Sequence, residues 1–243
     1  MTVSLDLPVP ARALAVAAHP DDVEFGAGAT LAKWAASGCT ILHVVCTDGS
    51  KGSWNPEHDR DRLIAARQDE QRAAARALGG SGDVEFLGWP DGELENVTAA
   101  RAQLVSSIRR FRPDVVLGHD PWKRYRLHPD HRHAGFLTVD AIVAARDPLF
   151  FPEVGPGHHR PRLLLLFEAD EPDHVEDAAG FVEHKVRALL AHRSQLKSTM
   201  GIDDPAAADQ LDAFSHRIVG DLASAGRLAD VDLGEAFKLL RDL

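Results

Sequence analysis

The chain has 243 residues, of which 44% are hydrophobic and 26% are charged, the proportions of a globular protein with a substantial core. Its net charge of −10 argues against general nucleic-acid binding, which requires a positive surface. No apolar stretch approaches the ~20 residues of a membrane span, and residues 1–12 lack the features of a secretion signal. Cys39 and Cys46 are the only cysteines and lie in a strand-like segment, which favours a reducing, cytoplasmic location.

Short apolar runs alternate with helix-like segments along the first two thirds of the chain. We expect a long loop at 146–162, whose length suggests a functional or interface role, and a mostly helical remainder from 176. The expected strands are 13–18, 40–46, 84–87, 114–118 and 163–167, and the expected helices are 25–37, 59–78, 98–111 and 128–145.

Strands that alternate with helices predict an α/β fold. We expect a doubly wound, mostly parallel, Rossmann-like sheet with helices on both faces. A single domain should span residues 1–243, with its core at about 12–170 and a mostly helical C-terminal part at about 174–243. In such sheets, ligands bind at the carboxyl ends of the strands.

Several potential metal or proton ligands follow the first expected strand, in the segment Ala18-His-Pro-Asp-Asp-Val-Glu24. His19 and Asp22 are three residues apart, a spacing that places two side chains on one face of a helix. Asp21 would then point in a different direction, beside a metal ion without binding it.

A second motif, His128-Pro-Asp-His131, opens a later helix and repeats the spacing of three residues. Two histidines and one carboxylate would leave a metal ion one open position, as in catalytic zinc sites, and the same set also binds ferrous iron. Each motif alone is more typical of a helix cap. Two such motifs, both at strand-to-helix edges, favour the metal site.

These motifs resemble the LmbE-like (PIG-L) family of zinc-dependent N-deacetylases, over residues 13–195. The resemblance also includes Thr47-Asp-Gly49, Arg67-Gln-Asp-Glu70, Leu87-Gly-Trp-Pro-Asp-Gly92 and Pro113-Asp-Val-Val116. It implies a hydrolase that removes the N-acetyl group from an N-acetylglucosamine-type sugar conjugate, a small molecule. An amidase of mycothiol conjugates, with the same mechanism, is the alternative within the family.

The resemblance also assigns roles to individual residues. Asp21 matches the general base that activates a metal-bound water for attack on the amide. His128 matches an imidazolium that faces the oxyanion, and Asp130 would orient it and favour its charge. The implied metal ligands are His19, Asp22 and His131.

Further candidates for substrate contacts are Arg67, Tyr125, Arg126 and Trp89. Arg67 matches a family arginine near the substrate, although pairing with Asp69 or Glu70 on a helix surface is an equal alternative. Some mycothiol-pathway relatives have a tyrosine where this chain has Arg126, and Tyr125 lies one residue earlier, which leaves open which of the two stabilises the oxyanion. Aromatic rings at the active edge could stack on a sugar: Trp54, Trp89 and Trp122.

Other interpretations remain. The cluster Lys123, Arg124, Arg126 and Arg132 would either bind an anionic substrate group or form a solvated loop. Phe25-Gly-Ala-Gly28 suggests a nucleotide-binding module, but Leu31 replaces the third glycine of that fingerprint. A metal-binding protein without turnover would have no use for Asp21. The oligomeric state, a homo-oligomer included, stays open.

Overall fold

One sheet of eight strands organises the computed structural model, which describes residues 3–243. Met1 and Thr2, which begin the segment examined for a secretion signal, lie outside the described residues. The strands are β1 Ser4–Leu5, β2 Arg12–Ala17, β3 Thr40–Thr47, β4 Val84–Trp89, β5 Val115–His119, β6 Leu163–Phe167, β7 His174–Asp177 and β8 Gly234–Arg241. The helices are α1 Asp22–Ala36, α2 Arg60–Ala77, α3 Thr98–Phe111, α4 Pro129–Arg146, α5 Val182–Leu189 and α6 Ala208–Gly226, with short turns η1 Arg193–Gln195, η2 Leu196–Met200 and η3 Arg227–Ala229.

The strand order β1-β7-β8-β6-β5-β2-β3-β4 confirms the predicted fold class. Strands β2 to β6 pair in parallel, and β2 lies between β3 and β5, with Ala15 opposite His43 on one side and Leu117 on the other. Because these strands are parallel, the segments that follow β2, β3, β4 and β5 emerge at the same edge of the sheet.

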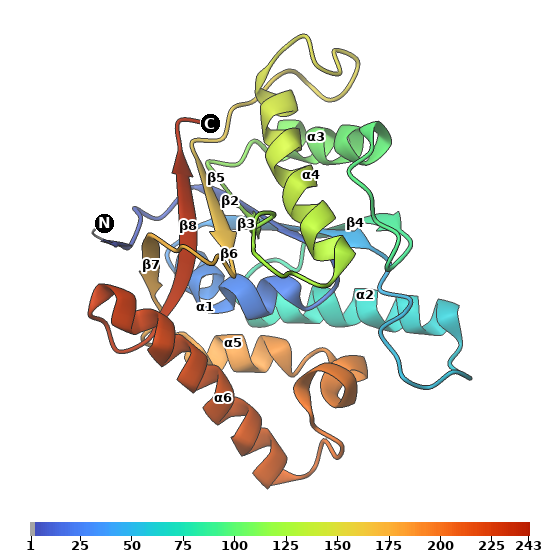
Figure 1. Ribbon diagram of the computed structural model, residues 1–243, viewed down its shortest axis with the longest axis vertical. Coiled ribbons are helices and arrows are strands. Elements are labelled where there is room, and N and C mark those ends of the chain that lie inside the picture. The colour runs from blue at the N-terminus through green and yellow to red at the C-terminus, as the bar shows by residue number, and fades with distance from the viewer. Residues whose placement is uncertain (1–2) are drawn as a thin grey trace.

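Alternate residues of β2 enter two separate cores. Ala13, Ala15 and Ala17 pack with α1 and α2 on one face of the sheet. Leu14 and Val16 pack with α3 and α4 on the other face. The alternation follows from the two-residue period of a strand, and Figure 1 shows the corresponding layers, with α3 and α4 above the sheet and α1 and α2 below it.

The C-terminal part of the chain returns to the sheet, which the sequence analysis did not predict. Strand β8 runs antiparallel between β6 and β7, and β1 pairs with β7 at the edge. Helix α5 packs against α1, and α6 forms an outer layer through Phe214, Ile218 and Leu222. Within residues 3–243, no helix has both the length and the apolar character that crossing a bilayer requires.

The loop predicted at 146–162, with a functional or interface role, begins at residue 147 in the structure and lies at the end of α4 remote from His131 (Figure 1). The buried guanidinium of Arg109 fixes its base by donating hydrogen bonds to the carbonyls of Phe150, Phe151 and Val154. This position separates the loop from the segments that carry the two motifs.

Gly26 and Gly28 lie inside α1 and are explained by close packing. A Cβ atom at Gly26 would lie 2.5 Å from the ring of Phe167 on β6, and one at Gly28 would lie 3.1 Å from Cγ of Lys185 on α5. The two glycines that suggested a nucleotide-binding turn instead allow α1 to pack closely against β6 and α5.

Candidate active site

The segment from His19 to Asp22 turns sharply between β2 and α1. Asp21 has a left-handed backbone with a φ of 94°, and Asp22 is the first residue of α1. His19 precedes the helix, so the two side chains do not share a helical face as the spacing argument assumed. The turn itself brings them together, because the backbone N–H of His19 donates to Asp22 Oδ2 at 2.7 Å, and His19 Nδ1 lies 3.5 Å from the same oxygen.

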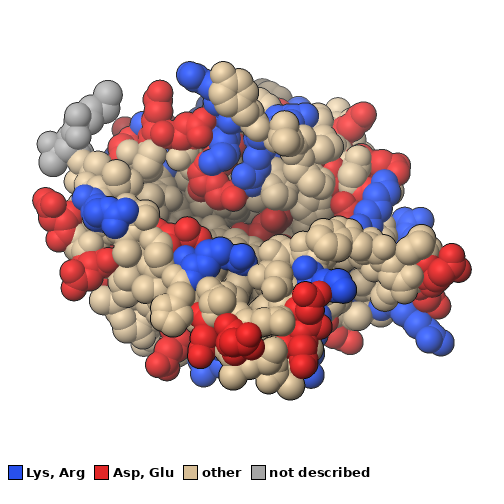
Figure 2. Space-filling model, turned by 60° about the horizontal axis from the view of Figure 1, so that its bottom comes forward, with Lys and Arg blue, Asp and Glu red and all other residues tan. Residues whose placement is uncertain are grey.

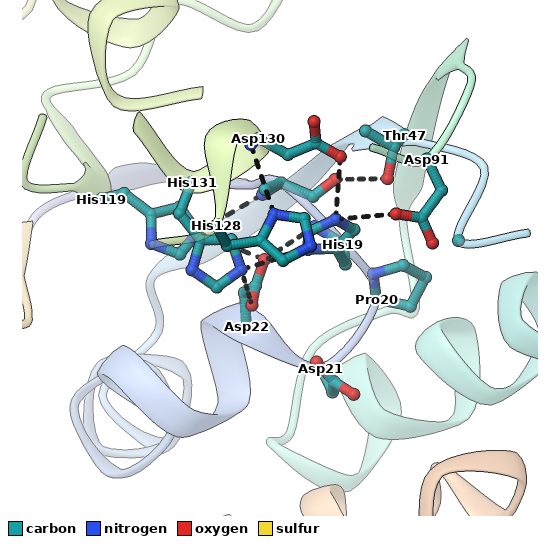
Figure 3. A network of polar contacts seen from close by, with 12 residues as sticks. His19, Pro20, Asp21, Asp22, Thr47, Asp91, His119, His128, Asp130 and His131 are labelled. Carbon is teal, nitrogen blue, oxygen red and sulfur yellow. Dashed lines mark hydrogen bonds and ion pairs between the residues drawn. The ribbon is translucent and has the colours of Figure 1, made fainter. Parts of the chain in front are cut away.

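The start of α4 brings His131 to this turn. His131 Nε2 lies 3.1 Å from His19 Nδ1 and 3.3 Å from Asp22 Oδ1. Adjacent ligands of a tetrahedral zinc ion with bonds near 2.0–2.1 Å are separated by about 3.3 Å. The two histidine nitrogens therefore lie at a separation that fits one such ion, and each lies close to a different oxygen of the Asp22 carboxylate (Figure 3).

Two buried carboxylates orient His19 by contacting Nε2, the ring nitrogen that does not face His131. Its Nε2 lies 3.0 Å from Asp130 Oδ2 and 3.2 Å from Asp91 Oδ1. A hydrogen on Nε2 that is shared with these acceptors leaves the lone pair of Nδ1 free for a metal ion. Burial opposes the charge of Asp130, but hydrogen bonds from His19 and the backbone N–H of Gly92 outweigh it and lower the pKa of Asp130.

The expected pairing of Asp130 with His128 is wrong. His128 is the N-cap of α4 with an exposed side chain, whereas Asp130 in the first turn is buried and points to His19. Partial burial and repulsion by positive charge on His19 and His131 lower the pKa of His128, so the imidazolium form is disfavoured. Its Nδ1 accepts the backbone N–H of Asp130 at 3.3 Å, which leaves the hydrogen of the neutral ring on Nε2.

Asp21 lies apart from this network, on the side of α2 (Figure 3). Its nearest ion-pair partner is Arg67, whose Nη2 lies 3.5 Å from Asp21 Oδ2. Burial raises the pKa of Asp21 to about 6, against the opposing charge of Arg67. A buried carboxyl with such a pKa is suited to accept a proton near neutral pH.

Arg67 does not pair with Asp69 or Glu70 on a helix surface. Its side chain is buried and donates to the carbonyls of Pro20 at 2.8 Å and Gly49 at 3.0 Å. Arg67 therefore holds the first motif against the loop that follows β3.

A buried polar network of Gln71, Glu24 and His192 holds the backbone of Asp21 in place. Gln71 Oε1 accepts the backbone N–H of Asp21 at 3.0 Å, and Gln71 Nε2 donates to Glu24 Oε1 at 2.7 Å. The other Glu24 oxygen lies 3.5 Å from His192 Nε2. No role for His192 was predicted, and the structure places it behind the first motif.

His119 belongs to the cluster but was not among the predicted site residues. Its Nε2 lies 3.2 Å from Asp22 Oδ2, and its ring stacks on His131 with centroids 4.4 Å apart. Overlapping sets of side chains lie close enough to hold a metal ion: His19, His128 and His131; Asp22, His119 and His131; and His19, Asp91, His128 and Asp130. The position of His119, the last residue of the buried strand β5, was the signal that could have identified it.

Arg126 reaches the cluster, whereas Tyr125 is 87% exposed. Arg126 Nη2 lies 3.2 Å from His119 Nδ1, and it also contacts His131 and Glu168. Glu168, on the segment after β6, was not predicted. Burial opposes its charge, but hydrogen bonds from His119 and Arg126 lower the pKa of Glu168 to about 2.

The remaining predicted contacts lie farther out. The indole N–H of Trp89 donates to Gln103 on α3 at 2.8 Å, and the indole ring packs against the core between the sheet and helices α3 and α4. These contacts direct the Trp89 side chain away from the histidines. Lys123 Nζ donates to the carbonyl of Glu168 at 2.7 Å. Figure 2 shows a hollow with acidic side chains in its floor and basic side chains on both of its edges.

The first part of the chain matches a known family. Residues 14–142 match the family model described as PIG-L, GlcNAc-PI de-N-acetylase. The chain belongs to the PIG-L family. This confirms the resemblance drawn from the two histidine motifs and replaces the nucleotide-binding alternative.

Individual members of the PIG-L family are similar over most of this chain. The diacetylchitobiose deacetylase of Thermococcus kodakarensis is 34% identical over 187 residues, covering 76% of this chain and 70% of that protein. A mycothiol S-conjugate amidase of Streptomyces coelicolor is 36% identical, covering 76% of this chain and 82% of that protein. The solved structure of N,N'-diacetylchitobiose deacetylase from Pyrococcus horikoshii has a TM-score of 0.84 and 27% identity, covering 96% of this chain and 84% of that one.

Proposed function

We propose that this protein is a zinc-dependent N-deacetylase that hydrolyses the acetamide group of an N-acetylglucosamine-type sugar conjugate. The observation that carries the proposal is the convergence of two histidine nitrogens and a carboxylate. His19 Nδ1 and His131 Nε2 lie 3.1 Å apart, and they lie 3.5 Å and 3.3 Å from Oδ2 and Oδ1 of Asp22, respectively. Membership of the PIG-L family and the similarity to diacetylchitobiose deacetylases support the choice of substrate.

Asp21 is the proposed general base. A zinc ion held by the three ligands would supply Lewis acidity, which polarises a carbonyl and makes an attacking water more acidic. Asp21 accepts the proton of that water as its oxygen adds to the amide carbon. Asp21 then returns the proton to the amide nitrogen as the C–N bond breaks, which yields acetate and a primary amine.

His128 is the proposed oxyanion donor in its neutral form. The hydrogen on Nε2 provides a hydrogen bond to the developing negative charge without requiring an imidazolium. Arg126 acts from behind His119 and His131, where its positive charge favours the same developing anion. Tyr125 has no part in this proposal because its side chain points to solvent.

A mycothiol-conjugate amidase is the alternative, and it differs only in the acyl group removed. The location we propose is the cytoplasm, which suits the two cysteines. Both are free and buried, Cys46 fully and Cys39 with 8% of its surface exposed.

The test is a screen of N-acetylated sugar conjugates with purified, zinc-reconstituted protein. Release of acetate and of a primary amine in equal amounts is the expected result, and it should stop with a chelator and return with zinc. Amine release from larger N-acyl groups, without acetate release from N-acetyl substrates, would instead favour the amidase. Failure to cleave any amide after zinc reconstitution would refute the proposal.

A further inference from the structure

We propose that helix α4 pairs with α4 of a second copy of this chain, antiparallel and across a two-fold axis. Within the described residues, more than half of the large apolar side chains that are exposed lie between 122 and 150, on α4 and on the segments that flank it. Besides Trp122, they are Tyr125, Leu127, Phe136, Val143, Leu149 and Phe150. Such a concentration of exposed apolar side chains is typical of an interaction surface, and it does not depend on the proposed reaction.

The outer face of α4 provides the centre of this surface. Phe136 and Val143 are seven residues apart, or two helical turns, so both side chains point to the same side of the helix. They expose 37% and 36% of their surface, and Val139 lies between them, partly buried. Helix α3 is the one described helix that packs extensively against α4, and it leaves this face uncovered.

The charges on either side of these apolar residues favour a second copy as the partner. Arg132 lies one turn before Phe136, and Asp147 lies one turn after Val143. A two-fold axis that crosses α4 next to Val139 places Phe136 opposite the partner's Val143. The same operation places Arg132 opposite the partner's Asp147, so each end of the helix pair would contain two opposite charges.

Both charges are available for this pairing. The Arg132 guanidinium donates to the backbone carbonyls of Arg126 and Leu127 and forms no ion pair with a carboxylate of the described residues. Asp147 lies 3.5 Å from the neighbouring Arg146, and 44% of its side chain is exposed. Neither contact is a buried ion pair that dimerisation would have to break.

The acidic residue nearest to the axis does not oppose the approach of a second copy. Asp140 Oδ2 accepts hydrogen bonds from Arg101 Nη2 at 2.9 Å and from Asn96 Nδ2 at 2.7 Å. These contacts direct the Asp140 carboxylate toward α3 and compensate its charge.

The two ends of α4 are complementary as well. Tyr125 and Leu127, before the helix, and Leu149, after it, are almost fully exposed. Because α4 has 18 residues and is about 27 Å long, antiparallel pairing brings the segment before one helix next to the segment after the other. Leu149 and Phe150 of each copy would then cover Tyr125 and Leu127 of the other. This would give the loop after α4 an interface role.

Such an interface would also support the active site. Arg126 lies between Tyr125 and Leu127 in the sequence, but its side chain points inward to His119 and His131. A partner that covers Tyr125 and Leu127 therefore restricts the backbone that carries Arg126.

A membrane surface is a less suitable occupant of this face. The chain has a net charge of −10, which opposes contact with anionic lipid headgroups. A bilayer also offers no counterpart to Arg132 and Asp147 at fixed positions along the helix, whereas a second copy does so by symmetry.

The first experiment measures the mass of the purified protein by sedimentation velocity at micromolar concentration. The wild type should contain an even number of chains. Phe136→Asp should halve the mass, because it places a charge on each side of the axis within the apolar centre. Val219→Asp is the matched control, since Val219 on α6 is 38% exposed, against 37% for Phe136, and this variant should keep the wild-type mass.

The second experiment tests the pairing of charges and leaves Phe136 and its ring contact with Trp122 intact. Arg132→Glu and Asp147→Arg should each weaken association by at least about tenfold in Kd, because each places like charges opposite one another. The double variant Arg132→Glu/Asp147→Arg restores opposite charges at both ends and should return Kd to near the wild-type value.

A wild type that remains monomeric at high micromolar concentration would overturn the proposal. A mass that Phe136→Asp leaves unchanged, or that Val219→Asp reduces equally, would also count against it. Single charge reversals without effect, or a double variant no tighter than the single ones, would refute the antiparallel arrangement of the two helices.

Discussion

The side-chain carbonyl of Gln71 accepts the backbone N–H of Asp21 at 3.0 Å, and this hydrogen bond ties helix α2 to the proposed general base. Asp21 has a φ of 94°, a backbone conformation that costs a non-glycine residue about 1–2 kcal/mol. The amide of Gln71 cannot rotate freely because its nitrogen donates to the buried Glu24 at 2.7 Å. Gln71 is therefore a positioning residue for Asp21.

Gln71→Ala should lower kcat by about 10- to 100-fold while zinc content and KM change little, because a small displacement of the base costs rate rather than affinity. Steady-state kinetics and metal analysis on the same preparation check this. Gln68→Ala, one turn earlier on α2, is the matched control and should retain activity. A parallel loss of zinc in Gln71→Ala would assign Gln71 to the stability of the metal site instead.

Asp21→Asn should retain zinc and lose turnover by about 10²–10⁴-fold, since an amide of the same shape cannot accept the proton of the attacking water. The backbone N–H that bonds to Gln71 is unchanged, so the turn should remain intact. Metal analysis, thermal unfolding and acetate release together test this. A variant with near wild-type kcat would exclude Asp21 as the base.

The zinc content of single variants distinguishes two overlapping ligand sets that both include Asp22 and His131. The third ligand is His19 in the proposed set and His119 in the other. His131→Ala should lose most of its zinc in either arrangement. If the ligands are those proposed, His19→Ala should also lose zinc, whereas His119→Ala should keep it and change mainly the rate. The measurement is metal per protein chain after dialysis against a weak chelator. Zinc loss in His119→Ala together with retention in His19→Ala would reverse the ligand assignment.

The predicted elements up to residue 167 agree with the structure because their signals are local. The runs that became β2 and β3 are mostly apolar, as expected of parallel strands covered on both faces, and their polar residues are Arg12, Thr40, His43 and Thr47. Glycine or proline marks the adjacent helix ends. Strand β8 has no such signal. Its sequence, Gly-Glu-Ala-Phe-Lys-Leu-Leu-Arg, contains good helix formers, and only pairing with β6 and β7 makes it a strand.

The active site shows the same division between local and distant signals. His19, Asp22 and His131 could be proposed because two short motifs carry them. The partners of His19 could not be derived in this way, since Asp91 follows β4 and Asp130 turns toward His19 only because α4 packs beside β5. The assumed pair of Asp130 and His128 failed for that reason: neighbours in the sequence point in different directions at a helix N-terminus.

Glu235 on β8 and Lys185 on α5 stabilise an interruption in α1. The helix is kinked at Ala27, which leaves backbone groups without helical partners. Glu235 accepts the N–H groups of Ala29 at 3.0 Å and Thr30 at 2.7 Å. Lys185 Nζ donates to the carbonyl of Phe25 and lies 2.6 Å from Glu235 Oε1. The unpredicted strand thus supports the helix that carries Asp22.

Glu235→Ala should destabilise the fold by about 3–5 kcal/mol, because it leaves the buried ammonium of Lys185 unpaired and two N–H groups uncapped. For a chain of this size, such a loss corresponds to a decrease in Tm of roughly 6–20 °C, measurable by calorimetry. Glu93→Ala is the control: it breaks the ion pair with Lys51, in which both side chains are more than half exposed, and should shift Tm far less. Equal shifts for the two variants would mean that the buried pair contributes no more than a surface contact, and that packing alone holds the kink in α1.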